Sequence, residues 1–334
     1  MLVTFSLLVL SAAAIYLACE YFVNGVEWIG QRFGLTQNAT GTVLAAFGTA
    51  LPESVVTFVA VAFGKDTAAQ DIGVGAALGG PLVLATVSYA VVGITYLTIK
   101  GGGMRWPAVM RSTSDLLARD QRWFMSIFVF KLALGLVAFA WKPWLGILFL
   151  LAYGAYVHKS MSAEGECAVA EDLEPLKLRP SAAAPHAGWA LLQVGLALVV
   201  IFIASHLFVH RLEQVGPMLG IPSQMVALLL SPIATELPET LNAVIWVRQR
   251  KPDLALANIS GAMMIQATIP SALGMFFTPW MLDRSLLWAG VVTMMSIAGL
   301  YVLIRWRKLT ARRFALFGLL YGLFGIGLVW ASQH

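Results

Sequence analysis

Two short segments of the chain place glutamates beside a threonine and a proline in apolar surroundings. They read GTALPE at 48–53 and ATELPE at 234–239. An ionised side chain at the centre of a lipid bilayer costs about 2.5–3.5 kcal/mol on insertion scales. Glu53, Glu236 and Glu239 therefore need compensation, and no Lys or Arg except Lys131 falls at a comparable depth. Protons or bound cations are the natural compensation, so the two segments predict a cation site.

Each segment also supplies neutral oxygen atoms close to its glutamate. A proline inside a helix cannot donate a hydrogen bond to the carbonyl four residues earlier, so each proline frees one carbonyl. A threonine lies one turn before the last glutamate of each segment. Hard cations such as Ca²⁺ take six to eight oxygen ligands, about what two such segments can offer together. The predicted cation ligands are the carbonyls of Gly48 and Ala234, the hydroxyls of Thr49 and Thr235, and the carboxylates of Glu53 and Glu239. Of these, Glu53 and Glu239 are the predicted metal-binding residues.

Glu236 adds a third carboxylate that the first segment lacks. It stands three residues before Glu239, which makes the two side chains neighbours on a helix. When two carboxylates lie close together, one of them holds its proton more tightly. Glu236 is therefore a candidate cation ligand and the candidate proton-coupling residue. Two alternatives stay open: Glu236 faces a water-filled vestibule, or both segments are proline-kinked helices with protonated, purely structural glutamates.

The composition predicts an all-α integral membrane protein around these segments. Of the 334 residues, 59% are hydrophobic and only 12% are charged, and the mean hydropathy is +0.79. A soluble domain carries about 25% charged residues, whereas a membrane span needs roughly 20 apolar residues. Ten transmembrane helices are predicted, at about 2–28, 38–63, 72–98, 122–140, 143–158, 188–210, 223–247, 254–279, 285–305 and 313–331.

The basic residues predict how these spans are oriented. Of the 22 Lys and Arg, 17 lie in odd-numbered loops between the spans, four lie in or beside even-numbered loops, and one lies within a span. By the positive-inside rule the odd loops are cytoplasmic, so both termini are outside the cell. This alternation also accounts for the net charge of +5 without a nucleic-acid partner. Glu27, at the inner end of the first span, and Glu213 are expected to be solvated.

The two halves of the chain resemble each other. The sequence at 22–58 aligns without gaps on 208–244, at an offset of 186, and the pairs include Thr, Leu, Pro and Glu of the two motifs. With five spans in each half, the second copy enters from the opposite face, which gives two inverted five-helix repeats. The predicted units are a first repeat at 1–158, a polar and mobile cytoplasmic linker at 159–186, and a second repeat at 187–334.

The paired motifs resemble a known family. GTALPE and ATELPE are similar to the G-T-S-L-P-E cores of the two α-repeats in the cation/calcium antiporter superfamily, that is, the sodium/calcium exchanger family in its prokaryotic form. The resemblance covers nearly the whole chain and extends to the LLARDQRW sequence before the fourth span. It implies that Glu53 and Glu239 are central cation ligands, together with Thr49 and Thr235.

This sequence also departs from the family pattern. The motif serine is Ala50 in the first copy and Glu236 in the second. In the helices that follow the motifs, the family serines are replaced by Gly80 and Ala262. Leu84 and Gln266 stand where the family has Asn or Asp, and the amide of Gln266 is a further candidate ligand. Fold and class are therefore expected to carry over, while sodium coupling is not.

We accordingly expect a secondary active antiporter in the inner membrane of the cell. It exports Ca²⁺ or a similar cation in exchange for Na⁺ or H⁺, and the transported cations take the place of any cofactor. Its predicted partners are the lipid bilayer and inorganic cations, with no nucleic acid or protein among them. No Gly-x-Ser-x-Gly or His-Glu-x-x-His motif indicates an enzyme. The alternative is a cation channel or a transport-inactive membrane protein of the same fold.

The predicted orientation can be tested by cysteine labelling. Single cysteines at positions 170 and 334 should react with an impermeant maleimide from opposite sides of the membrane, because one lies in the linker and the other at an outward terminus. Labelling of both positions from the same side would contradict the orientation.

Overall fold

The computed structural model describes residues 2–63, 67–99, 106–162, 173–182, 185–218 and 229–333, and all regular elements in these ranges are helices. Six helical segments of this part are long and apolar enough to cross a membrane. They are Val3–Arg32, Val74–Thr98, Ala187–Phe208, Pro252–Phe277, Arg284–Arg305 and Ala311–Val329. The all-α prediction is confirmed for the described residues.

Most helices begin and end close to the predicted spans. The first half holds α1 (Leu2–Arg32), α2 (Gln37–Ala39), η1 (Thr40–Ala45), α3 (Ala46–Phe63), α4 (Thr67–Val83), η2 (Leu84–Ser88), α5 (Tyr89–Thr98), α6 (Trp106–Leu134), η3 (Lys142–Leu145) and α7 (Gly146–Met161). The second half holds α8 (Ala187–Met218), α10 (Ser231–Thr235), α11 (Leu237–Arg248), α12 (Pro252–Phe277), α13 (Arg284–Arg305), α14 (Ala311–Leu316) and α15 (Gly318–Gln333). The fourth predicted span is the exception, because α6 begins at 106 and ends six residues before 140.

Local sequence explains where several of these helices stop and start. After α1, Gly34 adopts a φ of +63°, and the N–H of Leu35 donates to the carbonyl of Gly30 at 2.8 Å. This is the Schellman arrangement, in which a glycine tolerates the left-handed conformation that closes a helix. The next helix starts two residues later, where the hydroxyl of Thr36 accepts from the N–H of Ala39. The chain thus reverses between α1 and the helix that carries the first motif.

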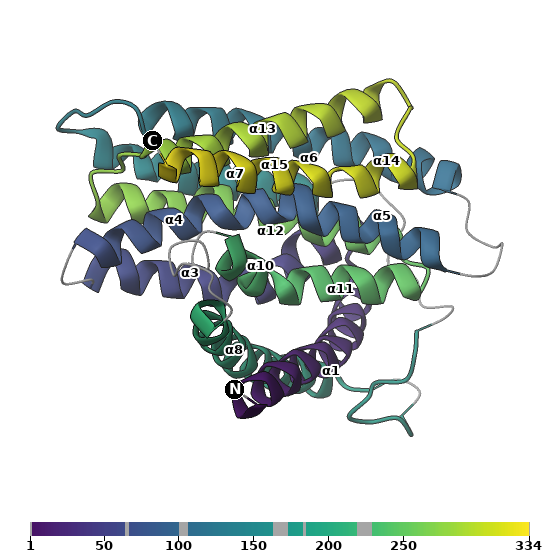
Figure 1. Cartoon of the computed structure of the whole chain (residues 1–334). Helices are drawn as coiled ribbons and strands as arrows, with labels where there is room; N and C mark the ends of the chain where they lie inside the picture. Colours follow the sequence, from purple (N-terminus) through teal and green to yellow (C-terminus); the bar gives the residue numbers. More distant parts are fainter. Residues whose placement is uncertain are drawn as a thin grey trace.

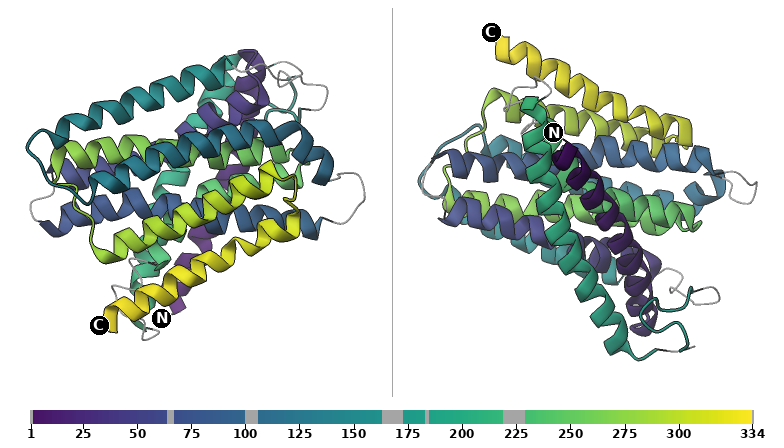
Figure 2. Two further views of the ribbon diagram at one scale, coloured as in Figure 1. Left: turned by 90° about the horizontal axis from the view of Figure 1, so that it is seen from above. Right: turned by 60° about the horizontal axis from the view of Figure 1, so that its bottom comes forward.

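The helices form two groups. In Figures 1 and 2, α1 and α8 lie side by side and run at a steep angle to the remaining helices. The most apolar stretches of these two helices are only 22% buried, whereas that of α12 is 83% buried. Helix α12 packs against α3, α4, α6, α7 and α11 and so forms the centre of the larger group. The exposed apolar faces of α1 and α8 suit contact with lipid.

The helix bounds recur with the offset found in the sequence. Shifting α1 by 186 residues gives 188–218, and α8 spans 187–218. Shifting α3 gives 232–249, and α10 with α11 spans 231–248. The shift fails for α6 and α13, whose bounds differ. The two motif helices and the helices before them therefore occupy equivalent positions along the sequence of the two halves.

Part of the linker is held against the helices, contrary to the expectation that it is mobile. Leu176 is fully buried beside Ile29 and Ala190. The side-chain amide of Asn24 donates to the carbonyls of Glu174 and Pro175 at 3.3 Å. Segment 173–182 thus packs where α1 and α8 meet, at the opposite end of the molecule from both termini (Figures 1 and 2).

Glu27 lies at the same end and corrects the expectation that it is solvated. Its side chain is only 7% exposed. One carboxylate oxygen accepts from the indole N–H of Trp246 at 2.8 Å, and the other forms an ion pair with Lys251. The side chain of Glu213, which the 186-residue offset pairs with Glu27 in sequence, lies outside the described residues. Glu27 therefore ties the end of α1 to the end of α11.

The buried contacts of Glu27 predict that it contributes more to stability than Glu20, the other glutamate of α1. Glu27→Gln should lower the unfolding temperature of the detergent-solubilised protein by an amount that corresponds to about 1.5–3 kcal/mol, because it removes a buried, charge-assisted bond. Glu20→Gln is the matched control: Glu20 pairs with Lys177 at 3.4 Å, but its side chain is 32% exposed. Such exposed pairs contribute about 0–1 kcal/mol. Equal effects of the two substitutions would contradict the assignment.

Candidate functional site

The two motif helices carry their prolines differently. Helix α3 continues through Pro52 without interruption. The second motif is broken: α10 ends at Thr235, α11 begins at Leu237, and Glu236 between them has φ −85° and ψ 6°. Pro238 stands in the first turn of α11, where a missing N–H costs least. The proline therefore starts a new helix in the second copy, and the break places Glu236 at the junction.

Glu236 is fully buried and is held by α12. Its Oε1 accepts a hydrogen bond from the side-chain amide of Gln266 at 2.6 Å. The backbone carbonyl of Glu236 accepts from the hydroxyl of Thr240 at 2.9 Å, and that hydroxyl lies 2.6 Å from the hydroxyl of Ser88 in η2. Full burial does not fit the alternative of a water-filled vestibule. The junction is instead fixed from two neighbouring helices.

Gly80 explains how this buried carboxylate fits. A Cβ atom at position 80 would lie 2.7 Å from Oε1 of Glu236 and 2.7 Å from Oε1 of Gln266. Any larger side chain there would displace one of the two, since real Cβ atoms do not approach that closely. A serine at position 80, as in the family pattern, would require the ends of these two side chains to shift. The absence of a side chain at Gly80 leaves the space that the ends of Glu236 and Gln266 occupy.

Glu239 occupies the first turn of α11 and is 1% exposed. The partial positive charge at a helix N-terminus stabilises a carboxylate there. Around its backbone, the side-chain amide of Asn258 reaches the carbonyl of Glu239 at 3.4 Å, and the thiol of Cys19 reaches the carbonyl of Pro238 at 3.7 Å. Glu239 thus sits where α1, α11 and α12 come together.

The predicted hydroxyl and carbonyl ligands lie inside the same group of helices. Thr49 is buried and donates to the carbonyl of Ala45 at 3.2 Å, while Thr235 donates to the carbonyl of Pro232 at 3.1 Å. Each hydroxyl proton is used within its own helix. Ala234 is 1% exposed, and a Cβ at Gly48 would lie 3.0 Å from the ring of Phe22.

One predicted ligand cannot be placed by its side chain. The backbone of Glu53 belongs to α3, but its side chain lies outside the described residues. Among the described residues, no three His, Cys, Asp or Glu side chains come together as a metal site.

Leu84, where the family has an acidic or amide side chain, is fully buried at the start of η2, a π-helical turn. A second π-helical turn, η1, leads into α3. Such turns are frequent at functional sites because they shift the helix register locally. Ala50 and Ala262 are also fully buried, so apolar side chains fill several of the expected oxygen positions.

Sequence reasoning missed Asn242. It lies one turn after Glu239 in α11 and is fully buried. Neither its Oδ1 nor its Nδ2 has a hydrogen-bond partner in the described part of the chain. A lone amide in an apolar helix, three residues from a glutamate, was the signal that could have identified it. It extends the polar face of α11 beyond the motif.

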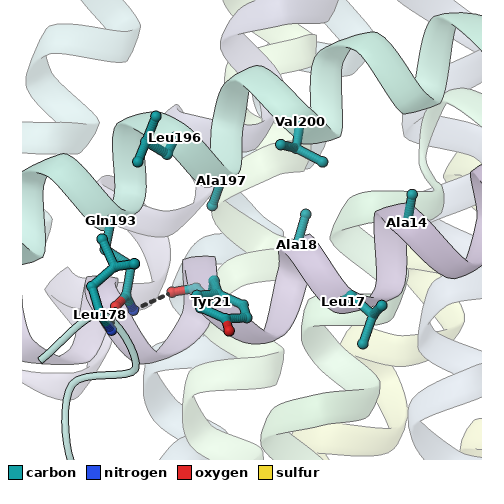
Figure 3. A pocket seen from close by; sticks show the side chains of 9 residues that line it. All are labelled: Ala14, Leu17, Ala18, Tyr21, Leu178, Gln193, Leu196, Ala197 and Val200. Carbon is teal, nitrogen blue, oxygen red and sulfur yellow. Dashed lines mark hydrogen bonds between the residues drawn. The ribbon is translucent and has the colours of Figure 1, made fainter. Parts of the chain in front are cut away.

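A separate pocket lies between α1 and α8, with a volume of about 350 Å³. Figure 3 shows Ala14, Leu17 and Ala18 on one side and Leu196, Ala197 and Val200 on the other. Its main polar contact is at one end, where the amide of Gln193 donates to the carbonyl of Tyr21 at 2.8 Å (Figure 3). This apolar lining offers no ligand set for a cation.

Solved structures with the same arrangement of helices include the sodium–calcium exchanger NCX_Mj. A structure of it soaked with zero Na⁺ and Ca²⁺ superposes with a TM-score of 0.72, covers 97% of this chain and 98% of its own, and is 19% identical. A structure soaked with 2.5 mM Na⁺ and 10 mM Sr²⁺ gives a TM-score of 0.71 at 20% identity and covers 96% and 97% of the two chains. These likenesses show a common fold.

Sequence comparison identifies relatives of similar length. The inner membrane protein YrbG of Escherichia coli is 23% identical over 92% of this chain and 90% of its own. The putative antiporter CaxA of Alkalimonas amylolytica is 24% identical over 80% of this chain and 79% of its own. Residues 3–161 and 189–331 match the family described as sodium/calcium exchanger protein. That family consists of transporters and not of enzymes. The resemblance in the two motifs is thereby confirmed: the chain belongs to the sodium/calcium exchanger protein family.

Proposed function

We propose that the protein is a secondary active antiporter that exports Ca²⁺ or a similar divalent cation across the inner membrane in exchange for Na⁺ or H⁺. Alternating access would be carried out by ten transmembrane helices arranged as two inverted repeats, with both termini outside and 159–186 in the cytoplasm. The observation that carries the proposal is the pair of buried carboxylates, Glu236 and Glu239, at a helix break in the centre of the bundle. Discontinuous helices of this kind form ion sites in transporters.

The binding of a divalent cation follows from the charges. Glu239 of the second motif and Glu53 of the first bring two negative charges, which one divalent cation neutralises. Thr49, Thr235 and the carbonyls of Gly48 and Ala234 supply neutral oxygens around them. When the cation leaves, the carboxylates remain in a low-dielectric interior, where the ionised form is disfavoured. The released site therefore takes up positive charge before the helices can return to the other state.

Protons are the counter-ion that this site favours. Gly80, Leu84 and Ala262 carry no side-chain oxygen at positions where the family has ligands, and a weakly held monovalent ion cannot easily spare them. Glu236 adds a titratable group within the same junction. The amide of Gln266 donates to one of its oxygens, which holds the carboxyl in place in either protonation state. Glu236 is accordingly the proposed proton carrier.

The buried Leu84 also favours a second candidate, a channel or a transport-inactive protein of this fold. Ion flux in proteoliposomes separates the three. Calcium uptake by an antiporter requires a gradient of the counter-ion, uptake through a channel does not, and an inactive protein shows no flux above that of empty vesicles.

Calcium exchange should depend on both repeat-related glutamates. Glu53→Gln and Glu239→Gln should each reduce Ca²⁺ uptake to the level of empty vesicles, because each removes one of the two charges that neutralise the cation. Radiotracer uptake in proteoliposomes measures the effect, with Glu20→Gln, a third exposed, as the control. Full uptake by either variant, at normal expression and with an unchanged unfolding temperature, would refute the ligand assignment.

Proton coupling should depend on Glu236. Adding Ca²⁺ to sodium-free vesicles should move protons in the opposite direction, as followed by a pH-sensitive dye, and Glu236→Gln should abolish that signal. Gln266→Glu is an informative partner variant, because it places a second acid at the hydrogen-bonding distance of Glu236. Strict dependence of Ca²⁺ uptake on sodium, without any pH change, would instead indicate sodium coupling.

A further inference from the structure

Lys131 is a fully buried lysine that the proposed exchange cycle does not use. It lies near the end of α6, and its side chain is 0% exposed. The Nζ atom donates to the carbonyl oxygen of Ala77 in α4 at 2.7 Å and to the hydroxyl of Ser271 in α12 at 3.2 Å. It also lies 4.6 Å from the centre of the Phe128 ring, in the geometry of a cation–π contact.

The carbonyl of Ala77 is available to Lys131 for a reason that is visible in the sequence. Pro81 lies inside α4, four residues after Ala77. Proline has no N–H, so the carbonyl that the residue at 81 would normally satisfy is left without its helical donor. The ammonium of Lys131 takes the place of that donor. The break in the helix and the buried charge therefore compensate each other.

The surroundings of the ammonium are those of a monovalent cation site. A freed backbone carbonyl, a hydroxyl and an aromatic face are all neutral groups that coordinate or attract a single positive charge. Within the described residues, no carboxylate lies within ion-pair distance of Lys131. The described neighbours that contact the ammonium are all neutral groups.

These contacts lie next to the candidate cation site. Ala77 is one turn before Gly80, the residue that packs against Glu236 and Gln266. Ser271 follows Gln266 by five residues in α12. Lys131 therefore reaches the same two helices that enclose the buried carboxylate, one turn farther along.

We propose that the ammonium of Lys131 is a built-in cation that occupies a monovalent-cation site beside the transport site. This inference refines the proposed antiport function and depends on that function, because it concerns a cation site beside the transport site. A tethered positive charge fills oxygen ligands that a mobile Na⁺ would otherwise bind. One fewer mobile monovalent ion is then needed to balance the carboxylates, in line with the loss of side-chain oxygens at Gly80 and Ala262.

The direct test is whether removal of the lysine creates Na⁺ binding. Lys131→Ala leaves both oxygens and opens room for an ion with water. In detergent, replacing choline by Na⁺ at constant ionic strength should raise its unfolding temperature by roughly 3 °C more than that of the wild type, since a ligand that binds only the folded state stabilises it. Lys131→Gln keeps more of the side-chain volume of the lysine. Replacing choline by Na⁺ should also raise its unfolding temperature more than that of the wild type.

Two further variants make the test specific. Lys131→Ala/Ser271→Ala lacks one of the two oxygens and should lose the added Na⁺ response. Lys142→Gln is the matched control, because Lys142 is also buried and donates to two carbonyls, those of Val137 and Trp280, but contacts neither α4 nor Gly80. It should respond to Na⁺ like the wild type.

A capping role alone makes a different prediction. If Lys131 only satisfies the Ala77 carbonyl, then Pro81→Ala restores the helical N–H and should rescue Lys131→Ala equally in choline and in Na⁺. That result, or an Na⁺ response of Lys131→Ala and Lys131→Gln equal to that of the wild type, overturns the proposal. The proposal is also overturned if neither Lys131→Ala nor Lys131→Gln can be purified as folded protein in choline or in Na⁺. An ion site would accept Na⁺ in place of the ammonium and so allow folding in Na⁺. Since these measurements need no transport, an absence of calcium exchange would refute the proposed function separately.

Discussion

A carboxylate inside an apolar helix bundle must be held by polar neighbours or neutralised, and the centre of this protein is arranged around that constraint. Glu236 lies at a helix break, accepts a hydrogen bond from Gln266, and presses against a glycine whose lack of a side chain makes the fit possible. The backbone of the break is tied to η2 through Thr240 and Ser88. Helices α4, α11 and α12 are thereby fixed relative to one another.

Proline is used in three different ways within this centre. In α3 the helix continues past Pro52, in α11 Pro238 begins a new helix after a break, and in α4 Pro81 leaves a carbonyl that a lysine side chain satisfies. The common physical element is the missing N–H. Of the carbonyls freed in this way, that of Ala77 accepts a hydrogen bond from the ammonium of Lys131. The two repeat-related prolines, Pro52 and Pro238, thus stand in different local structures although the sequences around them resemble each other.

The α1–α8 pair runs at a steep angle to this centre and packs one face against α10, α11 and η1. Its outer faces are exposed and apolar, and the pocket between the two helices is lined by small and aliphatic side chains. At one end, Glu27 of α1 binds Trp246 and Lys251, and segment 173–182 covers the junction of α1 with α8. These contacts tie the α1–α8 pair to α11 and to the linker at that end of the molecule.

The sequence by itself determined the all-helical class, the bounds of most helices, the duplicated motifs and the family, because hydropathy and short motifs are properties of each segment taken alone. It also singled out Glu236, Glu239, Gln266 and Gly80 as departures or candidates. It did not reveal that Gly80 makes room for Glu236 and Gln266, that Lys131 replaces the donor lost at Pro81, that Glu27 is buried, or that segment 173–182 packs on two helices. Each of these joins residues on separate helices or on a loop and a helix, 50 to more than 200 positions apart in most cases. Such contacts depend on how helices cross and rotate about their axes, and only the packing of the whole bundle decides which faces meet.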